Sequence, residues 1–378
     1  MDIYEKALKL HEEKKGKLEI VSKVEIKDKN DLSLAYSPGV AAVSKLIAND
    51  KKSAYTHTNK GNTIAVISDG SAILGLGNLG ALAAIPVMEG KCVLFKEFAN
   101  VDAIPICLDT QDSEEIIKTI QNLAPNYGGI NLEDISAPRC FEIEARVRES
   151  LDIPVLHDDQ HGTATVVLAG LINALKIKNT SQDKVKIIIN GAGAAGLAIT
   201  NLLIKYGFSQ IIVLDSKGAI YEGRGDLNSA KESVAKYTNK EKKAGDLADV
   251  IKDVDVFIGV SQGNILKPEM VKSMNKQAII FALANPTPEI MPEEALTAGA
   301  LLVATGRSDY PNQINNVLAF PGIFRGALDN KVKQITDKML IKAAENLAAL
   351  VALPVPYEIL PNVFDKRVAL VVADAIRD

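Results

Sequence analysis

The sequence predicts an α/β fold built from two units. Short apolar segments alternate with stretches of helical periodicity along the chain, a pattern typical of parallel sheets covered by helices. The chain has 378 residues, which is too long for one ordinary hydrophobic core. A glycine-rich turn follows an apolar segment near residue 190. We therefore expect a smaller α/β unit over 1–160 and a doubly wound unit over 161–378 that ends in helices.

The first unit begins with a charged helix and then alternates strands with helices. We expect strands at Thr63–Ser68, Cys92–Phe95, Ala103–Leu108, Gly128–Asn131 and Pro154–Leu156, and helices at Tyr4–Lys15, Ser113–Leu123 and Cys140–Leu151. The second unit repeats this alternation after a helix at Thr165–Ile177. Its expected strands are Val185–Ile189, Gln210–Leu214, Val254–Gly259, Ala278–Leu283 and Leu301–Ala304, and its last helices are Ile335–Val351 and Val363–Ile376.

Composition excludes several classes of protein. A net charge of −4 and a pI near 5.8 give no sign of a nucleic-acid partner. The charged N-terminus predicts no signal peptide, and three scattered cysteines suit a reducing compartment, so we expect a cytoplasmic protein. The longest uncharged run, Gly70–Met88, contains four glycines and a proline. It therefore reads as a buried turn and a core helix rather than a membrane span.

The pattern Gly-x-Gly-x-x-Gly occurs twice, and its surroundings favour the second copy. Gly191-Ala192-Gly193-Ala194-Ala195-Gly196 follows an apolar strand and opens a helix of small residues. In a Rossmann-type fold these glycines allow a tight turn, close approach of a pyrophosphate and close helix packing. The first copy, Gly75–Gly80, has no acidic residue after a following strand, so we interpret it as a tight backbone passage packed against the neighbouring domain.

Asp215 ends the strand that follows the second motif, nineteen positions after Gly196. A carboxylate there accepts hydrogen bonds from the ribose hydroxyls and repels a 2′-phosphate, which favours NAD. Lys217 and Arg224 follow closely and offset that repulsion, so NADP stays open. Val260 and Ser261, which follow the next strand of this unit's core, are expected to line the same cleft.

Two acidic pairs follow expected strands of the first unit, Glu133-Asp134 and Asp158-Asp159. Carboxyl ends of parallel strands are where open α/β sheets bind ligands. Like charges that converge there need a cation, and oxygen ligands suit Mg²⁺ or Mn²⁺. Each pair alone could equally be loop acids or helix caps. His157 and His161 lack a third soft ligand, so we expect them to be structural.

At this point the sequence resembles the small bacterial and archaeal type of malic enzyme. The segments that carry the resemblance span almost the whole chain in the family's order. They are Leu34–Ala41, Ile73–Gly80, Met88–Lys91, Asn131–Ile135, His157–Ala164, Gly191–Gly196, Ala284–Thr287, Asn315–Val317 and Phe320–Gly322.

The resemblance implies oxidative decarboxylation of malate to pyruvate and CO₂ with NAD or NADP, and decarboxylation of oxaloacetate. Glu133, Asp134 and Asp159 would ligate the metal. Lys91 would be the general base, with its pKa lowered by burial or nearby cations, and Asp158 would orient it or relay its proton.

The resemblance also implies that Tyr36 is the general acid that protonates the enolpyruvate carbon. Asn285, Asn316 and Asn315 would bind the substrate carboxylate or the cofactor, and the protein would be a homodimer. From sequence, Tyr36 could serve its own active site or that of a neighbouring copy.

One position departs from the family pattern. Larger malic enzymes carry an arginine before the Ile-Leu-Gly-Leu-Gly segment that binds a malate carboxylate, whereas this chain has Ser71 and Ala72. Two other readings remain. One is a different metal-assisted 2-hydroxy-acid dehydrogenase, and the other is a non-catalytic nucleotide-binding regulatory protein.

Overall fold

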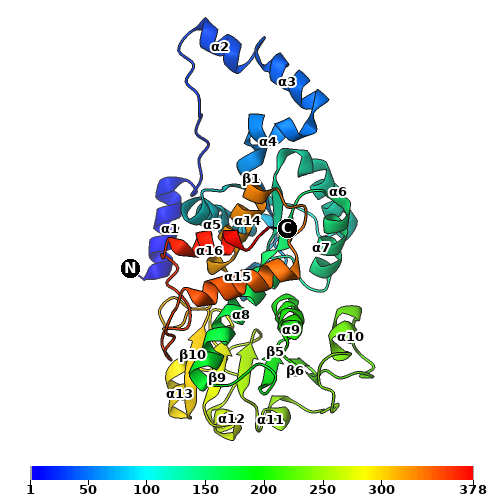
Figure 1. Cartoon of the computed structure of the whole chain (residues 1–378), viewed down its shortest axis with the longest axis vertical. Coiled ribbons are helices and arrows are strands. Elements are labelled where there is room, and N and C mark those ends of the chain that lie inside the picture. Colours follow the sequence, from blue (N-terminus) through cyan, green and yellow to red (C-terminus); the bar gives the residue numbers. More distant parts are fainter. Residues whose placement is uncertain (1, 378) are drawn as a thin grey trace.

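The computed structural model describes residues 2–377, and it has the α/β architecture that the sequence predicts. Two separate, mainly parallel sheets lie one above the other along the long axis of the molecule, with helices between and around them (Figure 1). The two-unit alternation of strands and helices is therefore present in the structure.

The first sheet has four parallel strands in the order β2-β1-β3-β4. Their bounds are β1 Thr63–Ser68, β2 Asp102–Cys107, β3 Gly129–Leu132 and β4 Val155–His157. One face buries Ala65 and Ile67 against α6 (Ser113–Leu123) and α7 (Arg139–Ser150). The other buries Ile64 and Val66 against α5 (Ala81–Ala99) and α14 (Phe320–Asn330), so both faces of this sheet are covered.

The second sheet has six strands in the order β10-β9-β8-β5-β6-β7. Their bounds are β5 Lys186–Asn190, β6 Gln210–Asp215, β7 Gly218–Ala219, β8 Val256–Gly259, β9 Ala278–Ala282 and β10 Ala300–Thr305. If β5 to β10 are renumbered 1 to 6 and the sheet is read from β7 to β10, the strand order is 3-2-1-4-5-6, which is that of a Rossmann sheet. The short β7 is the exception in direction, because it pairs antiparallel to β6. The order reverses between β5 and β8, and a dinucleotide cleft belongs at that point.

Helix α8 (Asp158–Lys178) joins the two sheets. It begins directly after β4 and packs against α9 (Ala194–Tyr206) and α15 (Asp337–Ala349). Most of its residues from Ala164 to Leu175 are buried on every side, as expected for a helix enclosed between two layers. One continuous apolar cluster therefore runs from the first sheet through α8 to the second.

The remaining helices are shorter or lie at the periphery. The α-helices are α1 Ile3–Lys14, α2 Lys29–Ala35, α3 Val40–Asn49, α4 Ala54–His57, α10 Ser229–Ala235, α11 Leu247–Val250, α12 Pro268–Ser273, α13 Pro292–Thr297 and α16 Arg367–Asp374. The 3₁₀ helices are η1 Lys51–Ser53, η2 Asn59–Asn62, η3 Ile73–Gly75, η4 Ala124–Asn126 and η5 Asn316–Leu318. Among residues 2–377, the structure contains no helix with the length and apolar character that crossing a bilayer requires.

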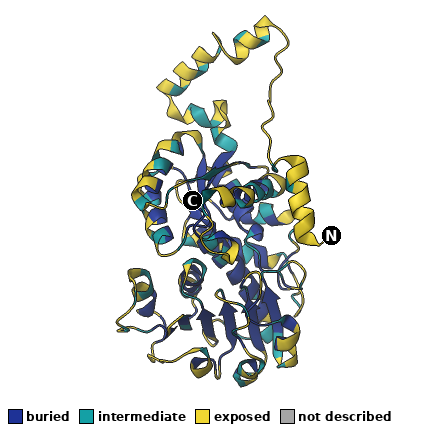
Figure 2. Cartoon of the chain, turned by 180° about the vertical axis from the view of Figure 1, so that it is seen from behind, coloured by how far each residue is buried: buried dark blue, intermediate teal, exposed yellow. Residues whose placement is uncertain are grey.

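Residues 18–50 form an arm that projects from the body and contains α2 and α3 (Figure 1). Just before the arm, Lys17 is tied to α5, because its backbone N–H donates to Glu89 and its ammonium to the carbonyl of Pro86. No residue of the arm itself is buried (Figure 2). The arm nevertheless carries many apolar side chains. Ile20 is 97% exposed and Leu34 is 69% exposed, so this chain alone leaves the arm uncovered.

The expected strand at Cys92–Phe95 is wrong, because these residues lie inside α5. A four-residue apolar run does not distinguish a strand from one turn of a buried helix. The buried positions Ala84, Met88, Cys92, Phe95 and Ala99 recur every three or four residues, which is the helical spacing. This correction places Lys91 on the inner face of a helix rather than at the start of a strand.

Candidate active site

Three carboxylates converge at the carboxyl ends of β3 and β4. Glu133 and Asp134 follow β3, Asp159 lies in the first turn of α8, and their ligand atoms lie within 4.8 Å of one another. The backbone N–H of Asp134 donates to Asp159, while the buried Oδ2 of Asp134 has no hydrogen-bond partner among the described residues. Burial, with the charges of Asp159 and Glu133, raises the pKa of Asp134 to about 8.

These residues fit a divalent cation. An orphaned, buried carboxylate oxygen is costly unless something coordinates it, and three converging oxygen donors are the ligands that Mg²⁺ and Mn²⁺ prefer. No histidine or cysteine belongs to the group. His161 instead pairs with Glu144 at 2.9 Å, as expected for a structural histidine.

The ammonium of Lys91 lies beside this cluster on α5. It donates to Glu133 at 2.9 Å and makes a second, short ion pair with Asp158, and all three side chains are buried. Its nitrogen also lies 3.9 Å from the centroid of the Phe320 ring. The expected lowering of the pKa of Lys91 is not found: burial lowers it, but the carboxylates of Asp158 and Glu133 outweigh burial and raise it.

Asp158 is buried and links Lys91 to Asn316. One of its oxygens accepts from Lys91 and, at 2.6 Å, from the side chain of Asn316 just before α14. Asp158 has no exposed surface, and its other oxygen has no partner among the described residues. Gly162 lies one turn further along α8, and a Cβ there would lie 1.8 Å from that oxygen. Only glycine therefore fits at position 162. Sequence reasoning did not single out Gly162.

Glu144 also escaped the sequence analysis, because on α7 it looks like one charged helix residue among several. It is buried, and it accepts hydrogen bonds from the backbone N–H of His157 and from the side chains of Gln160 and His161. These contacts fix the turn from β4 into α8. That turn carries Asp158 and Asp159, so Glu144 positions both without touching the cluster.

A similar set of contacts holds the segment after β1, which contains Ser71 and Ala72. Arg139, the first residue of α7, donates to the carboxylate of Asp69 at 2.8 Å and to the hydroxyl of Ser71 at 3.1 Å. The N–H of Ala72 in turn donates to the carbonyl of Asp134. An arginine therefore reaches this turn from a distant part of the chain. The charge of Arg139 is paired with Asp69, so Arg139 holds the segment after β1 against the loop that carries Asp134.

The second glycine motif forms the expected turn between β5 and α9. Gly191 has a φ of +120°, and a Cβ there would lie 2.6 Å from the carbonyl oxygen of Val260. A Cβ at Gly196 would lie 1.7 Å from the carbonyl oxygen of Gly191. A Cβ at Gly193, in contrast, would have no atom within 4 Å. Ala194 and Ala195 open α9, whose N-terminus has no side-chain cap, so its first N–H groups are available to phosphate oxygens.

The segments that follow β8 and β9 are held by a residue that sequence analysis missed. The buried carboxylate of Glu289 accepts from the backbone N–H of Ser261 at 3.1 Å and of Ala284 at 3.0 Å. Asn190, at the end of β5, donates to the hydroxyl of Ser261 at 2.7 Å. Burial raises the pKa of Glu289 to about 6.

Asp215 ends β6 as expected, and two cations hold its carboxylate. Arg224 and Lys231 both pair with the same oxygen. Together with the N–H of Lys217, these donors hold the pKa of Asp215 at about 2, against the opposing effect of burial. Lys231 was not expected in this role, because the sequence shows it only as one lysine of an exposed, Lys-rich stretch.

The three asparagines have different surroundings. Asn285 follows β9, and a Cβ at Gly75 would lie 2.8 Å from its carbonyl oxygen, so the first glycine motif is the tight passage against the second unit that we expected. Asn316 reaches Asp158, as described above. The side chain of Asn315 instead caps η5 by accepting from the N–H of Val317.

Tyr36 does not join this group. It ends α2 on the projecting arm and is 69% exposed, and no contact in the structure links it to Lys91 or Asp158 of the same chain (Figure 1). Within one chain, Lys91 therefore lies beside the carboxylates that the sequence suggested, whereas Tyr36 does not.

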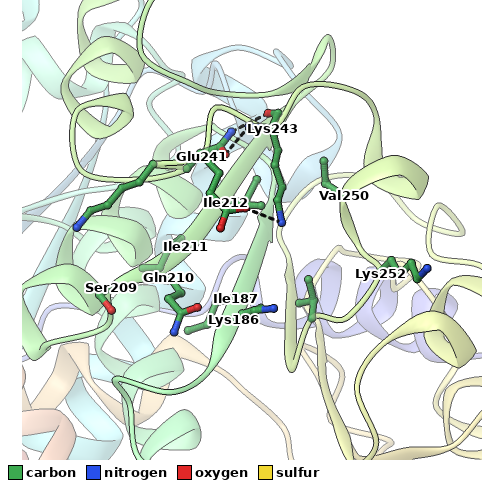
Figure 3. A pocket seen from close by; sticks show the side chains of 13 residues that line it. Lys186, Ile187, Ser209, Gln210, Ile211, Ile212, Glu241, Lys243, Val250 and Lys252 are labelled. Carbon is green, nitrogen blue, oxygen red and sulfur yellow. Dashed lines mark hydrogen bonds and ion pairs between the residues drawn. The ribbon is translucent and has the colours of Figure 1, made fainter.

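A separate hollow of about 210 Å³ lies at the other end of the second sheet. Lys186 and Gln210, the first residues of β5 and β6, line it together with Glu241 and Lys243 (Figure 3). Because it lies at the amino ends of these strands, it is distinct from the carboxyl ends, where a Rossmann-type sheet binds its dinucleotide.

Comparison with known proteins assigns the family. Residues 15–148 match the family model described as malic enzyme, N-terminal domain, and residues 160–377 match malic enzyme, NAD binding domain. The bifunctional malic/malolactic enzyme of Bacillus subtilis (strain 168) is 57% identical over 380 residues, covering all of this chain and 92% of that protein. An NADP-dependent malic enzyme of Rhizobium meliloti (strain 1021) is 52% identical over 94% of this chain and 47% of its own length.

The solved structures agree with the sequence comparisons. The crystal structure of an NAD-dependent malic enzyme from Thermotoga maritima superposes with a TM-score of 0.96 at 49% identity, covering 98% of both chains. At these identities and coverages, a shared fold without shared ancestry is excluded. The chain belongs to the malic enzyme family.

Proposed function

We propose that this chain oxidises and decarboxylates (S)-malate to pyruvate and CO₂, reduces NAD⁺ or NADP⁺, and depends on Mg²⁺ or Mn²⁺. The observation that carries the proposal is the position of Lys91, whose ammonium lies between Glu133 and Asp158 and next to the carboxylates of Asp134 and Asp159. A buried lysine beside a cation site is suited to taking a proton from a hydroxyl held by that cation.

The carboxylates would do two kinds of work. Glu133, Asp134 and Asp159 would hold the cation, while Asp158 would orient Lys91 and receive its proton. The bound cation would supply positive charge beside the hydroxyl and carboxylate of malate, and the nicotinamide would accept the hydride. Positive charge bound to the three ligands would also cancel part of the field that raises the pKa of Lys91, and would so increase the fraction of Lys91 that is neutral and able to accept a proton.

The cofactor would lie across the second sheet, with its pyrophosphate at the N-terminus of α9. Gly191, Gly193, Ala194, Ala195 and Gly196 would form the phosphate turn. Asp215 would face the adenosine ribose, and Val260, Ser261 and Asn285 would line the nicotinamide half. Asn285 and Asn316 are the proposed contacts to the substrate carboxylate, with Asn315, whose side chain caps η5, as the weaker candidate. The same site would decarboxylate oxaloacetate.

We further propose a homodimer in which the arm of each copy covers the other and Tyr36 completes the partner's site. The arm, residues 18–50, carries exposed apolar side chains and has no buried residue, and Tyr36 lies on it away from its own Lys91. A surface of this kind is covered by another protein surface in most soluble proteins. A symmetric exchange of arms would bury two such surfaces at once and bring an acid to each site.

Steady-state turnover of malate tests the reaction. We expect NAD(P)H and CO₂ to appear in equal amounts with Mn²⁺, and neither to appear with a chelator. Oxidation without CO₂ would instead indicate another metal-assisted 2-hydroxy-acid dehydrogenase. Cofactor binding with no turnover of any 2-hydroxy acid would indicate a regulatory nucleotide-binding protein.

Mixed dimers test the shared site. Tyr36→Phe and Lys91→Ala chains, each inactive alone, are co-expressed with different tags and the mixed dimer is purified. If Tyr36 acts on the partner, one of the two sites in that dimer is intact, and we expect about half the wild-type activity per dimer. If Tyr36 acts within its own chain, both sites are defective and the mixed dimer is inactive.

A further inference from the structure

Helix α5 carries two charged side chains on opposite sides. Lys91 faces inward, where its ammonium pairs with Glu133 and Asp158, whereas Glu89 is half-buried and faces the start of the arm. Residues two positions apart on an α-helix differ by about 200° around its axis. One turn of α5 therefore contacts the active site on one side and the chain that leads into the arm on the other.

Glu89 holds the chain at the point where the arm begins. Its carboxylate accepts from the backbone N–H of Lys17 at 3.1 Å, and the ammonium of Lys17 donates to the carbonyl of Pro86 at 2.7 Å. We call these two contacts the arm anchor. Gly16 has a φ of +102°, and a Cβ there would lie 2.9 Å from the Glu89 carboxylate. A Cβ at Gly90 would lie 3.2 Å from the ammonium of Lys17, so both glycines allow the close approach.

The other attachments on this side of the arm are weak. Helix α1, which precedes the arm anchor, has no buried residue. Further along the arm, Lys23 pairs with Asp102 at 3.8 Å, but Lys23 is 77% exposed and an exposed ion pair contributes little. The arm then returns to the body at α4 (Figure 1). The arm anchor therefore sets the direction in which the segment that carries Tyr36 leaves the body.

We propose that Glu89 is a positioning residue for the active site of the partner. By fixing the start of the arm on α5, Glu89 sets where Tyr36 of the same chain enters the neighbouring copy. Lys91, on the other side of that helix, serves its own site. The proposal rests on the shared site proposed above, and it extends that proposal by assigning the placement of Tyr36 to one side chain.

Substitutions of Glu89 in the full-length protein give the first test. Glu89→Ala removes the acceptor, and we expect kcat to fall about tenfold because a displaced acid protonates the product less well, while the dissociation constant of NADH stays the same. Glu89→Gln should keep most of the activity, since its amide oxygen accepts the same N–H. The matched control is Glu97→Gln, an exposed acid of α5 with no partner among the described residues, which should behave as the wild type.

Mixed dimers show in which site Glu89 acts. In the dimer of Glu89→Ala with Lys91→Ala, the site that keeps Lys91 receives its arm from the chain with an intact anchor. We therefore expect about half the wild-type activity. In the dimer of Glu89→Ala with Tyr36→Phe, one site receives the Tyr36→Phe arm and the other receives an arm without its anchor. We expect about a twentieth of the wild-type activity, because the one site with both Lys91 and Tyr36 is slowed about tenfold.

The reverse pattern would overturn the inference. Low activity with Lys91→Ala and half activity with Tyr36→Phe would mean that Glu89 acts on Lys91 of its own chain. Full activity of Glu89→Ala alone, or low activity in both mixed dimers, would also exclude the proposed role. Lys17→Met removes only the ammonium contact and is the milder variant. If Glu89→Ala does not fold, the same two dimers are made with Lys17→Met, which should give a smaller loss in the same pattern.

The dimer of Tyr36→Phe with Lys91→Ala keeps the two proposals apart. If that dimer has half the wild-type activity and the Glu89→Ala dimers show the reverse pattern, the assignment of Glu89 is wrong and the shared site stands. If that dimer is inactive, Tyr36 serves its own chain, and this inference fails together with the shared site.

Discussion

The side-chain amide of Asn316 donates a 2.6 Å hydrogen bond to the carboxylate of Asp158, across 158 residues of sequence. Asp158 opens α8, whereas Asn316 opens η5 just before α14 returns to the first sheet. The same carboxylate oxygen accepts the short ion pair from Lys91. The end of the second unit therefore helps to hold the proposed base of the first.

Asn316→Ala should lower turnover by weakening this contact. Loss of one hydrogen bond to a buried carboxylate costs about 1.5–3 kcal/mol, which corresponds to a fall in kcat/KM of about ten- to a hundredfold. Asn315→Ala is the comparison: it removes a cap on η5 and should lower the melting temperature with a smaller kinetic loss. Equal kinetic losses in the two variants would contradict a special role for Asn316.

Two substitutions of Lys91 should distinguish the contribution of its positive charge to stability from its role as a base in turnover. Lys91→Met leaves the carboxylates of Glu133 and Asp158 buried without their cation, which costs about 3–5 kcal/mol of unfolding free energy at neutral pH. Lys91→Arg keeps the charge but cannot become neutral, so it should retain more stability. Both variants should lose turnover by about a hundredfold or more, as expected for a general base. Thermal unfolding and malate kinetics together check both parts, and an active Lys91→Arg would exclude Lys91 as the base.

Metal affinity should rise with pH. Burial and neighbouring carboxylates raise the pKa of Asp134 to about 8, so a proton competes with the cation below that pH. Because this folded-state pKa exceeds the unfolded value, the metal-free protein should also lose stability as the pH rises through about 8. We expect the Mn²⁺ affinity, measured by titration, to increase between pH 6 and 9, and Mn²⁺ to raise the melting temperature more at pH 9 than at pH 6.

Asp134→Asn is the matched variant for this experiment. It removes the titrating carboxylate from the ligand group and should flatten the pH dependence as well as weaken Mn²⁺ binding. A wild-type affinity that does not vary between pH 6 and 9 would show that Asp134 is already ionised in the metal-free protein.

Local sequence patterns predicted the sheets better than the site. Apolar runs bounded by glycine or polar residues located the nine longer strands, because both faces of parallel strands are buried. The same criterion failed at Cys92–Phe95, where a buried helix has an equally apolar run. The acids after β3 and β4 were found because strand ends in such a fold converge.

Residues that act by bracing could not be found in this way. Glu144, Arg139 and Glu289 each support a turn that is distant in sequence, and each looks locally like an ordinary charged residue. Gly162 is required only because Asp158 folds back against its own helix. These roles depend on tertiary distances, and one sequence does not contain them. Tyr36 is the opposite case. The sequence around it matches the family pattern, but in the folded chain it does not lie near Lys91 or Asp158.

Glu289 should make the stability of the second unit depend on pH. Burial raises its pKa from an ordinary 4.5 to about 6, so its contribution is fully present below pH 4.5 and is lost as the pH rises through 6. The shift corresponds to about 2 kcal/mol. In Glu289→Gln this position no longer titrates. The difference in unfolding free energy between wild type and variant should therefore change by about that amount between pH 4.5 and 7.5, as urea unfolding at each pH would measure. A constant difference would place the pKa of Glu289 near its usual value.

Two glycines of the phosphate turn should respond differently to the same substitution. A Cβ at Gly196 would lie 1.7 Å from the carbonyl oxygen of Gly191, so Gly196→Ala must move β5 and α9 apart and should lower the melting temperature clearly. Gly193 has open space around its Cβ position and a φ of −89° that alanine accepts. Gly193→Ala should therefore keep the melting temperature while its methyl group obstructs the pyrophosphate and weakens NADH binding by about tenfold or more. Unchanged NADH binding in a stable Gly193→Ala would mean that the dinucleotide does not approach the backbone at this turn.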